Sequence, residues 1–516
     1  MQFRNPIIPG YNPDPSITRV GDTFYLVNSS FEFFPGVPIR ESKNLVNWAF
    51  TGYVLDRESQ LPLHGSRPSG GIFAPTIRYH DGMFYMITTN VNLMPTGHPN
   101  FIVHAEDPAG PWSEPAWISQ VGIDPSVFFD DDGSCWYTGT GDDGNGRQGI
   151  VCFKLDPMTG EILSDKKIIS HGSGGKCPEG PHLYKKDGWY YLMLAEGGTE
   201  FGHMETIGRS RTIDGPYEFC PNGPILTARD DNGNGSPIQC TGHADIVDDA
   251  NGNWWIVSLG TRPIGPMAHH LGRETFLAQL DWVDGWPVVR NGGLMQLEAE
   301  GDLPQANTVK PVSDDLHCDF ANMDKLPPEF NYLRNPVAEN YKLDGALTLT
   351  GTAERLSAPN TTPTFTGIRQ TQFISCTTAV LGADIPEGCS AGITAYGIHT
   401  HHYDVLITRR YGKLYAQLRK HLYDMEMVAA EIPLPECELV SLRITSNRTD
   451  YTFSVDYGQG YIVLGHGMTI GLATEVTETM TFTGAYLAMF AENGAVRFKS
   501  FDYEAEWEPA PKRGRP

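Results

Sequence analysis

Three carboxylates in the first 200 or so residues begin short motifs of similar form. Asp14 and Asp124 each begin the motif Asp-Pro-Ser, and Glu179 begins Glu-Gly-Pro. Paired carboxyl groups can cleave a glycosidic bond, because one protonates the leaving oxygen while the other activates water or attacks. A third negative charge nearby would keep the acid protonated. These residue types predict a glycosidase with Glu179 as the acid, Asp14 as the base and Asp124 as the group that raises the pKa of Glu179.

The elements that must position these residues are indicated by an internal repeat. A turn of the Asp-Gly kind followed by paired aromatic residues occurs five times, at 21–25, 81–85, 132–137, 187–191 and 251–255. Such turns predict β-hairpins, and the spacing of about 50 to 65 residues gives room for a four-stranded blade. The repeat therefore predicts a five-bladed β-propeller.

A second motif stands about ten to twelve positions before each aromatic pair, at the predicted start of an inner strand. Its leading residues are Asp14, Ala74, Asp124, Glu179 and His243. A single carboxylate before proline or glycine is often an ordinary turn residue. Four polar residues at equivalent places are harder to explain in that way, because like charges brought together cost stability. We expect the four to converge on the propeller axis. Opposite walls there suit the roughly 6.5 to 9.5 Å separation of an inverting enzyme.

The predicted fold class is all-β, with a five-bladed β-propeller catalytic domain followed by a β-sandwich. The aromatic repeat stops near Gly301, so the propeller is assigned to residues 1–302. Residues 303–316 contain two prolines among polar residues and are expected to form a linker. Segments that alternate with period two fill 317–508 and predict a C-terminal β-sandwich, followed by a disordered tail at 509–516.

Composition excludes several classes of partner. The formal net charge of -24 disfavours nucleic acid and anionic membrane surfaces, and no apolar run approaches the ~20 residues of a membrane span. The first residues lack a secretory pattern, which predicts a cytoplasmic protein. The nine cysteines include no C-x-x-C pair for zinc or redox chemistry, and no cofactor is required.

Six motifs in this order resemble glycoside hydrolase family 43, in the subgroup of β-xylosidases and α-L-arabinofuranosidases that carry a C-terminal β-sandwich. They are NPDPS at 12–16, SFE and FPGV at 30–37, GGIFAP at 70–75, DPS at 124–126, PEGPH at 178–182 and GRET at 272–275. The resemblance covers nearly the whole chain. It implies the same roles for Asp14, Asp124 and Glu179, and an exo-acting, inverting release of terminal α-L-arabinofuranose or β-D-xylose from hemicellulose-derived oligosaccharides.

The resemblance implies further site residues. Arg273 would bond sugar hydroxyls and organise the carboxylates, Phe31 would form an apolar wall, and Phe482 of the sandwich would close the pocket. His243 would lie below the pocket and face a water-coordinated structural calcium. Phe73 stands where many β-xylosidases of the family have Trp, which slightly favours arabinofuranose. Each has a simpler interpretation: a surface ion pair for Arg273, core packing for the phenylalanines, and no metal for His243.

Two other functions stay open. A retaining fructosidase also combines a propeller with a sandwich, and a carbohydrate-binding protein without catalysis could use the sandwich as its lectin-like part. Sandwich-bearing relatives often form dimers or tetramers, so the resemblance allows a homo-oligomer, but the sequence does not indicate the oligomeric state. The sequence does not distinguish arabinofuranoside from xyloside preference.

Overall fold

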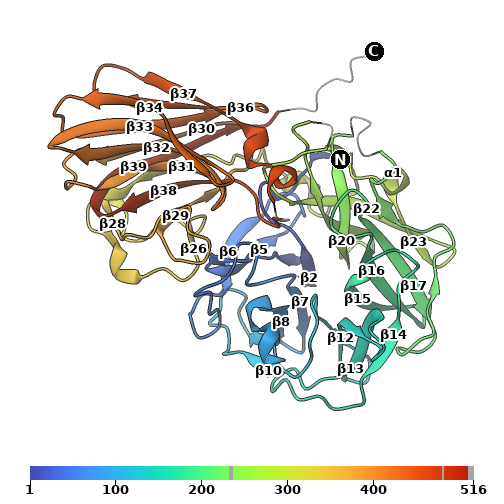
Figure 1. Cartoon of the computed structure of the whole chain (residues 1–516). Helices are drawn as coiled ribbons and strands as arrows, with labels where there is room; N and C mark the ends of the chain where they lie inside the picture. The colour runs from blue at the N-terminus through green and yellow to red at the C-terminus, as the bar shows by residue number, and fades with distance from the viewer. Residues whose placement is uncertain (232–235, 266, 479–480, 509–516) are drawn as a thin grey trace.

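The computed structural model describes residues 1–231, 236–265, 267–478 and 481–508, so the predicted tail at 509–516 lies outside the described residues. A propeller and a sandwich lie side by side (Figure 1). The predicted all-β fold class is confirmed. Helix is limited to α1 and six 3-10 turns in the described parts: α1 Arg290–Gly293, η1 Val91–Thr96, η2 Ala306–Thr308, η3 Phe320–Asn322, η4 Ala338–Asn340, η5 Thr469–Leu472 and η6 Thr474–Val476.

Five antiparallel sheets form the blades, and the first strand of each contacts the first strands of other blades around the axis. Blade I has β2 Ser16–Val20, β3 Thr23–Val27, β5 Gly36–Ser42 and β6 Ala49–Leu55. Blade II has β7 Thr76–His80, β8 Met83–Thr89, β9 Asn100–Ala105 and β10 Ala116–Ile118. Blade III has β11 Ser126–Phe129, β12 Cys135–Asp142, β13 Gln148–Lys154 and β14 Lys167–Ser170. Blade IV has β15 Glu179–Lys186, β16 Trp189–Glu196, β17 Met204–Ser210, β18 Glu218–Phe219 and β19 Leu226–Thr227; blade V has β20 Gln239–Asp248, β21 Trp254–Thr261, β22 Glu274–Val283 and β23 Trp286–Val289.

The repeated Asp-Gly turns join the first two strands of their blades. In blade II, Asp81 and Gly82 have φ of 48° and 86°, and His80 pairs with Met83 across the turn. Positive φ at both central residues is typical of a type I′ hairpin, whose twist matches that of the strands. The repeat seen in the sequence is therefore the hairpin that begins a blade.

The amino terminus is fixed to the last blade. β1 Gln2–Arg4 pairs with β24 Glu298–Glu300, and Ile8 bridges to Thr275 of β22. These contacts bring the segment that leads into Asp14 beside the strand that follows Arg273.

Two sheets make up the sandwich. One has the order β27 Tyr341–Leu343, β28 Leu347–Gly351, β39 Gly494–Glu506, β30 Ile374–Gly382, β35 Leu439–Ser446, β36 Asp450–Asp456 and β37 Ile462–Met468, with β25 Leu316–Asp319 also on β39. The other has the order β34 Met425–Leu434, β33 Lys413–Leu422, β32 His401–Arg410, β31 Ser390–Ile398, β38 Tyr486–Glu492, β29 Thr364–Arg369, β26 Asn331–Leu333 and β4 Phe33–Phe34.

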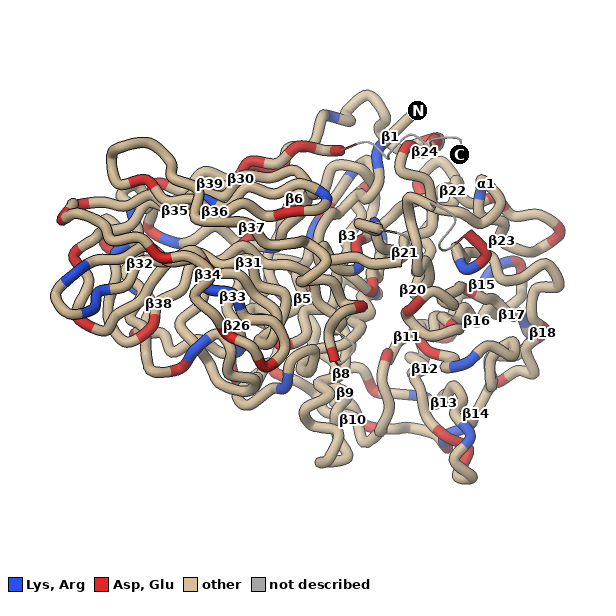
Figure 2. Tube along the Cα trace, turned by 45° about the horizontal axis from the view of Figure 1, so that its top comes forward, with Lys and Arg blue, Asp and Glu red and all other residues tan. Residues whose placement is uncertain are grey.

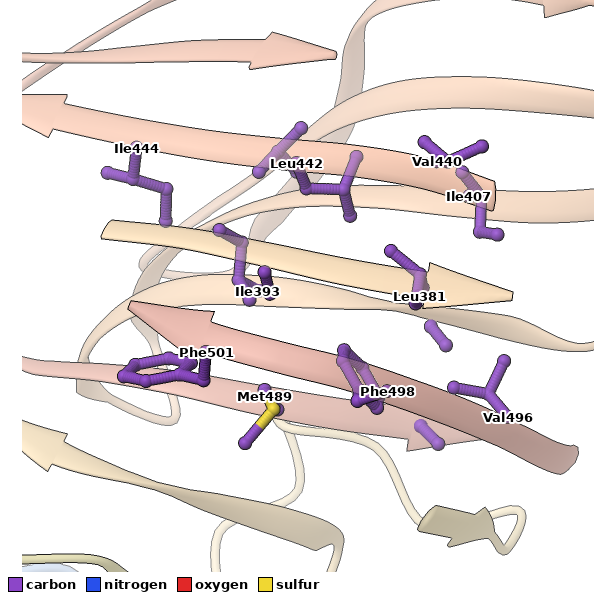
Figure 3. Packing of buried hydrophobic residues seen from close by; sticks show 14 of the residues in the cluster. Leu381, Ile393, Ile407, Val440, Leu442, Ile444, Met489, Val496, Phe498 and Phe501 are labelled. Atoms are coloured by element: carbon purple, nitrogen blue, oxygen red, sulfur yellow. The ribbon is translucent and has the colours of Figure 1, made fainter. Parts of the chain in front are cut away.

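The sandwich core lies between these sheets. Every second residue of β30 is buried, as a strand with one face on the core requires. Leu381, Ile393, Leu442 and Phe498 pack together from strands of both sheets (Figure 3). These buried residues join the two sheets through one apolar core.

One strand crosses between the domains. β4 belongs to the segment assigned to the propeller, but it pairs with β26, joining Phe34 to Tyr332 and Phe33 to Leu333. The sequence did not predict this exchange. Phe33 also stacks on Tyr486 of β38, with ring centroids 4.1 Å apart. The sandwich is thus anchored next to Phe31.

The charged residues of the described chain are not confined to one domain (Figure 2). Acidic residues are spread along the chain of both domains (Figure 2). No helix among the described residues is long and apolar enough to cross a membrane.

Candidate active site

All five leading residues of the blade motifs line one pocket of about 250 Å³: Asp14, Ala74, Asp124, Glu179 and His243. Each lies at or near the start of the first strand of its blade, and His243 lies within β20. The structure therefore brings together the residues that the repeat places at equivalent positions.

The backbone at these residues is strained. Asp14, Asp124 and His243 have φ of 52°, 55° and 47°, in the left-handed region that non-glycine residues rarely adopt. Such a conformation costs on the order of 1–3 kcal/mol and is concentrated at functional sites. Gly180 also has a positive φ, and a Cβ there would come within 3.2 Å of the His243 ring. The turn after Glu179 therefore requires glycine.

Asp14 is buried and surrounded by donors. Its Oδ2 accepts a hydrogen bond of 2.6 Å from the Ser29 hydroxyl, and its Oδ1 pairs with Arg273 at 3.1 Å. His243 Nδ1 is 3.8 Å from the same Oδ1. Burial alone would raise the pKa of Asp14, but Arg273, His243 and Ser29 outweigh it and hold that pKa below its ordinary value. Asp14 is therefore ionised at neutral pH.

Asp124 and Glu179 show the opposite shift. Burial raises the pKa of Asp124 well above its ordinary value, and Glu179 and then Asp14 raise it further. Burial also raises the pKa of Glu179, with Asp14 adding to the rise. The sequence attributed the shift of Glu179 to Asp124, whereas burial is the larger cause. Asp124 Oδ2 accepts the Gly180 N–H at 3.2 Å, which favours the charged form of Asp124. Glu179 is half-buried and reaches the pocket, so it is the better proton donor.

Arg273 lies deep in the pocket rather than on the surface. Besides Asp14, its Nη1 donates to the Thr199 hydroxyl at 3.1 Å and its Nη2 to the carbonyl of Phe482 at 3.3 Å. Its Nε is buried without a hydrogen-bond partner among the described residues. A buried donor of this kind costs stability unless something in the pocket accepts from it.

Three phenylalanines form one wall. The ring centroid of Phe31 is 5.2 Å from that of Phe73 and 5.6 Å from that of Phe482, and all three line the pocket. The Phe482 N–H donates to the Ser69 hydroxyl at 2.9 Å, which ties the sandwich loop to the propeller. The structure thus places Phe482 at the pocket, 209 residues after Arg273 in the chain.

Below the pocket, the axis is filled by a polar network with one residue from each blade: Ser16, Arg78, Ser126, His182 and Asp245. Arg78 pairs with Asp245 at 2.7 Å, and its Nη2 lies 3.1 Å from His182 Nδ1. Ser16 donates to Asp245 at 2.7 Å, and the Ser126 hydroxyl lies 3.0 Å from His182 Nδ1. The pocket therefore has a rigid, charged floor.

These residues do not suit direct calcium ligation. Calcium takes six to eight oxygens, but no three His, Cys, Asp or Glu side chains in the described chain are grouped to hold a metal. A guanidinium already neutralises Asp245. An ion held near His243 by water stays a prediction, which elemental analysis of the purified protein would test. That the protein needs no cofactor also stays a prediction.

Sequence reasoning missed one side of the pocket. Lys176, Cys177, Thr199, Glu200 and His203 line it from the loops next to β15 and β16. These residues lie outside the repeated motifs, so periodicity gave no signal for them. Burial lowers the pKa of His203 to about 4, and its Nδ1 lies 2.9 Å from the Cys240 carbonyl, so this histidine is neutral.

Comparison with known proteins agrees with this geometry. Residues 3–287 match the model of glycosyl hydrolases family 43, and residues 317–504 match the β-xylosidase C-terminal concanavalin A-like domain.

Named relatives cover most of the chain. A non-reducing end α-L-arabinofuranosidase of Bacteroides ovatus is 40% identical over 97% of this chain and 94% of its own length. A xylosidase/arabinosidase of Butyrivibrio fibrisolvens is 44% identical over 80% of each chain. The crystal structure of a xylan β-1,4-xylosidase of Bacillus halodurans superposes with a TM-score of 0.89, at 32% identity, over 97% of this chain and 100% of that one.

Proposed function

The chain belongs to family 43 of the glycosyl hydrolases, and we propose that it is an exo-acting, inverting member that releases terminal α-L-arabinofuranose, β-D-xylose or both from hemicellulose-derived oligosaccharides. The observation that carries the proposal is the contrast within one pocket. Asp14 is held ionised beside Arg273, whereas burial keeps a proton on the pair formed by Asp124 and Glu179.

This contrast supplies a base and an acid at neutral pH. Asp14 accepts a proton from a water molecule while the water oxygen bonds to the anomeric carbon. Glu179 gives its proton to the glycosidic oxygen as the bond from the anomeric carbon to that oxygen breaks. Asp124 shares with Glu179 the proton that burial keeps on the pair, and the Gly180 N–H, which favours the charged form of Asp124, lets that proton reside on Glu179.

The rest of the pocket selects a small terminal sugar. The wall of Phe31, Phe73 and Phe482 offers apolar faces for a sugar ring. Arg273 Nε, which has no hydrogen-bond partner among the described residues, is a donor that a sugar hydroxyl could satisfy. A volume of about 250 Å³ holds a single pentose, which supports action at chain ends.

The substrate is tested by kcat/KM on paired chromogenic β-D-xylopyranoside and α-L-arabinofuranoside, with Asp14→Ala as the blank. We expect measurable activity, with a higher kcat/KM for the arabinofuranoside. The ring of Phe73 is smaller than the Trp of many β-xylosidases and leaves more room in the pocket. Binding of both sugars without turnover would contradict the proposal and favour a carbohydrate-binding protein.

The stereochemistry is tested by the first anomer released, followed by NMR. We expect inversion. Retention would require a covalent intermediate on Asp14 and would contradict the proposed role of that residue as a base.

Self-association is also part of the proposal. β34 is the edge strand of its sheet and exposes Met425, Met427 and Val428, with Met427 57% exposed. Exposed apolar edges favour pairing with another chain. We expect light scattering to give a mass above the 57.0 kDa of one chain, and Met427→Glu to reduce it; a monomeric wild type would contradict this part.

The proposed compartment is the cytoplasm. All nine cysteines are unpaired, as in proteins of reducing compartments. Fractionation of the source cells is the test, and recovery of the enzyme outside the cytoplasm would contradict this assignment.

A further inference from the structure

A second cavity of about 250 Å³ lies where the propeller meets the sandwich, apart from the pocket that contains Asp14. Its walls come from the N-terminal segment, from β5 and β6 of blade I, from residues 312–316 and from β29. Two arginines, Arg40 of β5 and Arg369 of β29, line it together with the aromatic side chains Trp48 and Phe50.

Arg369 is a buried cation without an anionic partner. Only 7% of the residue is exposed, and it forms no ion pair among the described residues. Its Nε and Nη2 are buried without an aligned hydrogen-bond acceptor in the described chain, and the guanidinium lies 5.1 Å from the ring centroid of Tyr11. Burial alone would lower the pKa of Arg369, but the neutral Tyr486 hydroxyl is its main polar partner and raises that pKa. An unpaired buried charge is costly, so a fork of donors held in this way indicates a missing acceptor.

Arg40 brings a second positive charge to the same cavity. Its Nη2 donates to Asn12 Oδ1 at 3.0 Å and its Nη1 to Asn28 Oδ1 at 3.3 Å, so both partners are neutral amides. Burial and then the nearby Arg369 lower the pKa of Arg40 to about 10, while Tyr53 and Glu329 act in the opposite direction. Two like charges near one cavity, neither paired with a carboxylate in the described residues, favour an anionic ligand.

The other lining residues restrict the class of anion. Asp314, Asp315 and Glu329 also line the cavity, so a multiply charged phosphate would be repelled more strongly than a single carboxylate. Burial raises the pKa of Asp314, and its Oδ2 accepts a hydrogen bond of 2.8 Å from the Gln372 side-chain amide, so this carboxyl can also accept from a ligand hydroxyl. Trp48 and Phe50 give apolar faces of the kind on which sugar rings pack, and the Arg40 guanidinium is 5.5 Å from the Phe50 ring centroid.

We propose that this cavity binds a sugar acid that carries one carboxylate, such as a hexuronic acid, with the carboxylate between Arg40 and Arg369. Planar guanidinium forks match the two oxygens of a carboxylate. The site also reaches the catalytic loop: Asn12, which accepts from Arg40, donates its N–H to the Arg273 carbonyl at 3.0 Å and stands two residues before Asp14.

Isothermal titration calorimetry with D-glucuronate, D-glucose and inorganic phosphate tests the proposal on the full chain. We expect glucuronate to bind with one site per chain, and D-glucose and phosphate to bind at least about tenfold more weakly, because they lack the single carboxylate. A saturating pentose, added first, separates the two pockets: binding of glucuronate should persist.

Arg369→Met is the main variant, and Arg497→Met, an exposed arginine of the sandwich, is its control. We expect the first to weaken glucuronate binding at least about tenfold and the second to leave it unchanged. If Arg369→Met does not fold, Arg369→Lys, which keeps the charge but loses the fork, should also weaken binding. Absence of glucuronate binding to the wild type, equal binding of phosphate, loss of binding in the presence of pentose, or wild-type affinity in the Arg369 variants would overturn the proposal.

Discussion

The two cavities at the boundary of the domains have about the same volume, but they treat a buried arginine in opposite ways. Arg273 and Arg369 are each 7% exposed. Arg273 pairs with Asp14 at 3.1 Å, whereas Arg369 has no ion-pair partner in the described chain. The first charge is matched by the protein and fixes the ionisation of a catalytic group. The charge of Arg369 is balanced by the carboxylate of the proposed ligand. A buried arginine therefore serves catalysis in one cavity and ligand recognition in the other.

The largest expected effect tests whether the first cavity is the catalytic one. Glu179→Gln removes the proposed acid and keeps its shape, so kcat should fall by about 10² to 10⁴. Steady-state kinetics with Glu218→Gln, an exposed glutamate of blade IV, gives the control. A Glu179 variant with a near wild-type rate would remove the catalytic assignment.

The two arginines should differ in how much each contributes to the free energy of unfolding. Arg273→Met leaves Asp14 buried without its partner, and we expect a loss of about 3–5 kcal/mol in the free energy of unfolding. Arg369→Met removes an unpaired charge, and the change should be within about 0.5 kcal/mol or favourable. Denaturant unfolding of both variants measures the difference. Equal losses would mean that Arg369 stabilises the fold as much as Arg273 does, and would contradict the contrast between them.

The pH dependence follows from the opposite pKa shifts. On the acid side, we expect log kcat/KM to fall by about one per pH unit as Asp14 is protonated, at pH values below the ordinary pKa range of an aspartate. On the alkaline side, it should fall with the same slope as the pair of Asp124 and Glu179 loses its proton. The stability that Asp14 contributes is present above its unfolded pKa and is lost as pH falls through its lowered folded pKa. A profile in which Asp14→Asn leaves the acid limb in place would contradict this assignment.

The smallest expected effect concerns the wall between the domains. Phe482→Ala removes the ring that contacts both Phe31 and Phe73. Loss of its own contact with the sugar, worth about 0.5–1.5 kcal/mol, should lower kcat/KM roughly two- to tenfold. We expect the loss in KM rather than in kcat, because Phe482 contacts no carboxylate. Phe50→Ala, in the other cavity, should leave both constants unchanged. A reversed pattern would mean that Phe482 is core packing alone.

Much of the propeller could be predicted from sequence because its signals are local. Asp-Gly turns with aromatic pairs mark each hairpin, and the residue at the start of each blade motif follows from the repeat. The carboxylates were found in this way. The resemblance to the family added Arg273, Phe31, Phe73 and Phe482, which no periodicity indicates.

The rest depends on contacts between distant segments. Thr199 and His203 enter the pocket through loops outside the repeat, and Arg40 and Arg369 meet only because β29 lies against blade I. The left-handed backbone at Asp14 is a further example, since the motif shows a turn but not its strain. Nothing in the sequence marks Phe33–Phe34 as part of the sandwich.

The strand β4 limits where the chain can be divided into separately expressed domains. A propeller expressed alone would carry β4 unpaired, and a sandwich expressed alone would expose β26 as a new edge, so each half would gain a site for aggregation. Recombination at the linker would therefore be selected against, even though the linker is the obvious junction. The two halves should be inherited as one unit, and swapping sandwiches between related enzymes should succeed only when residues 33–34 are exchanged as well.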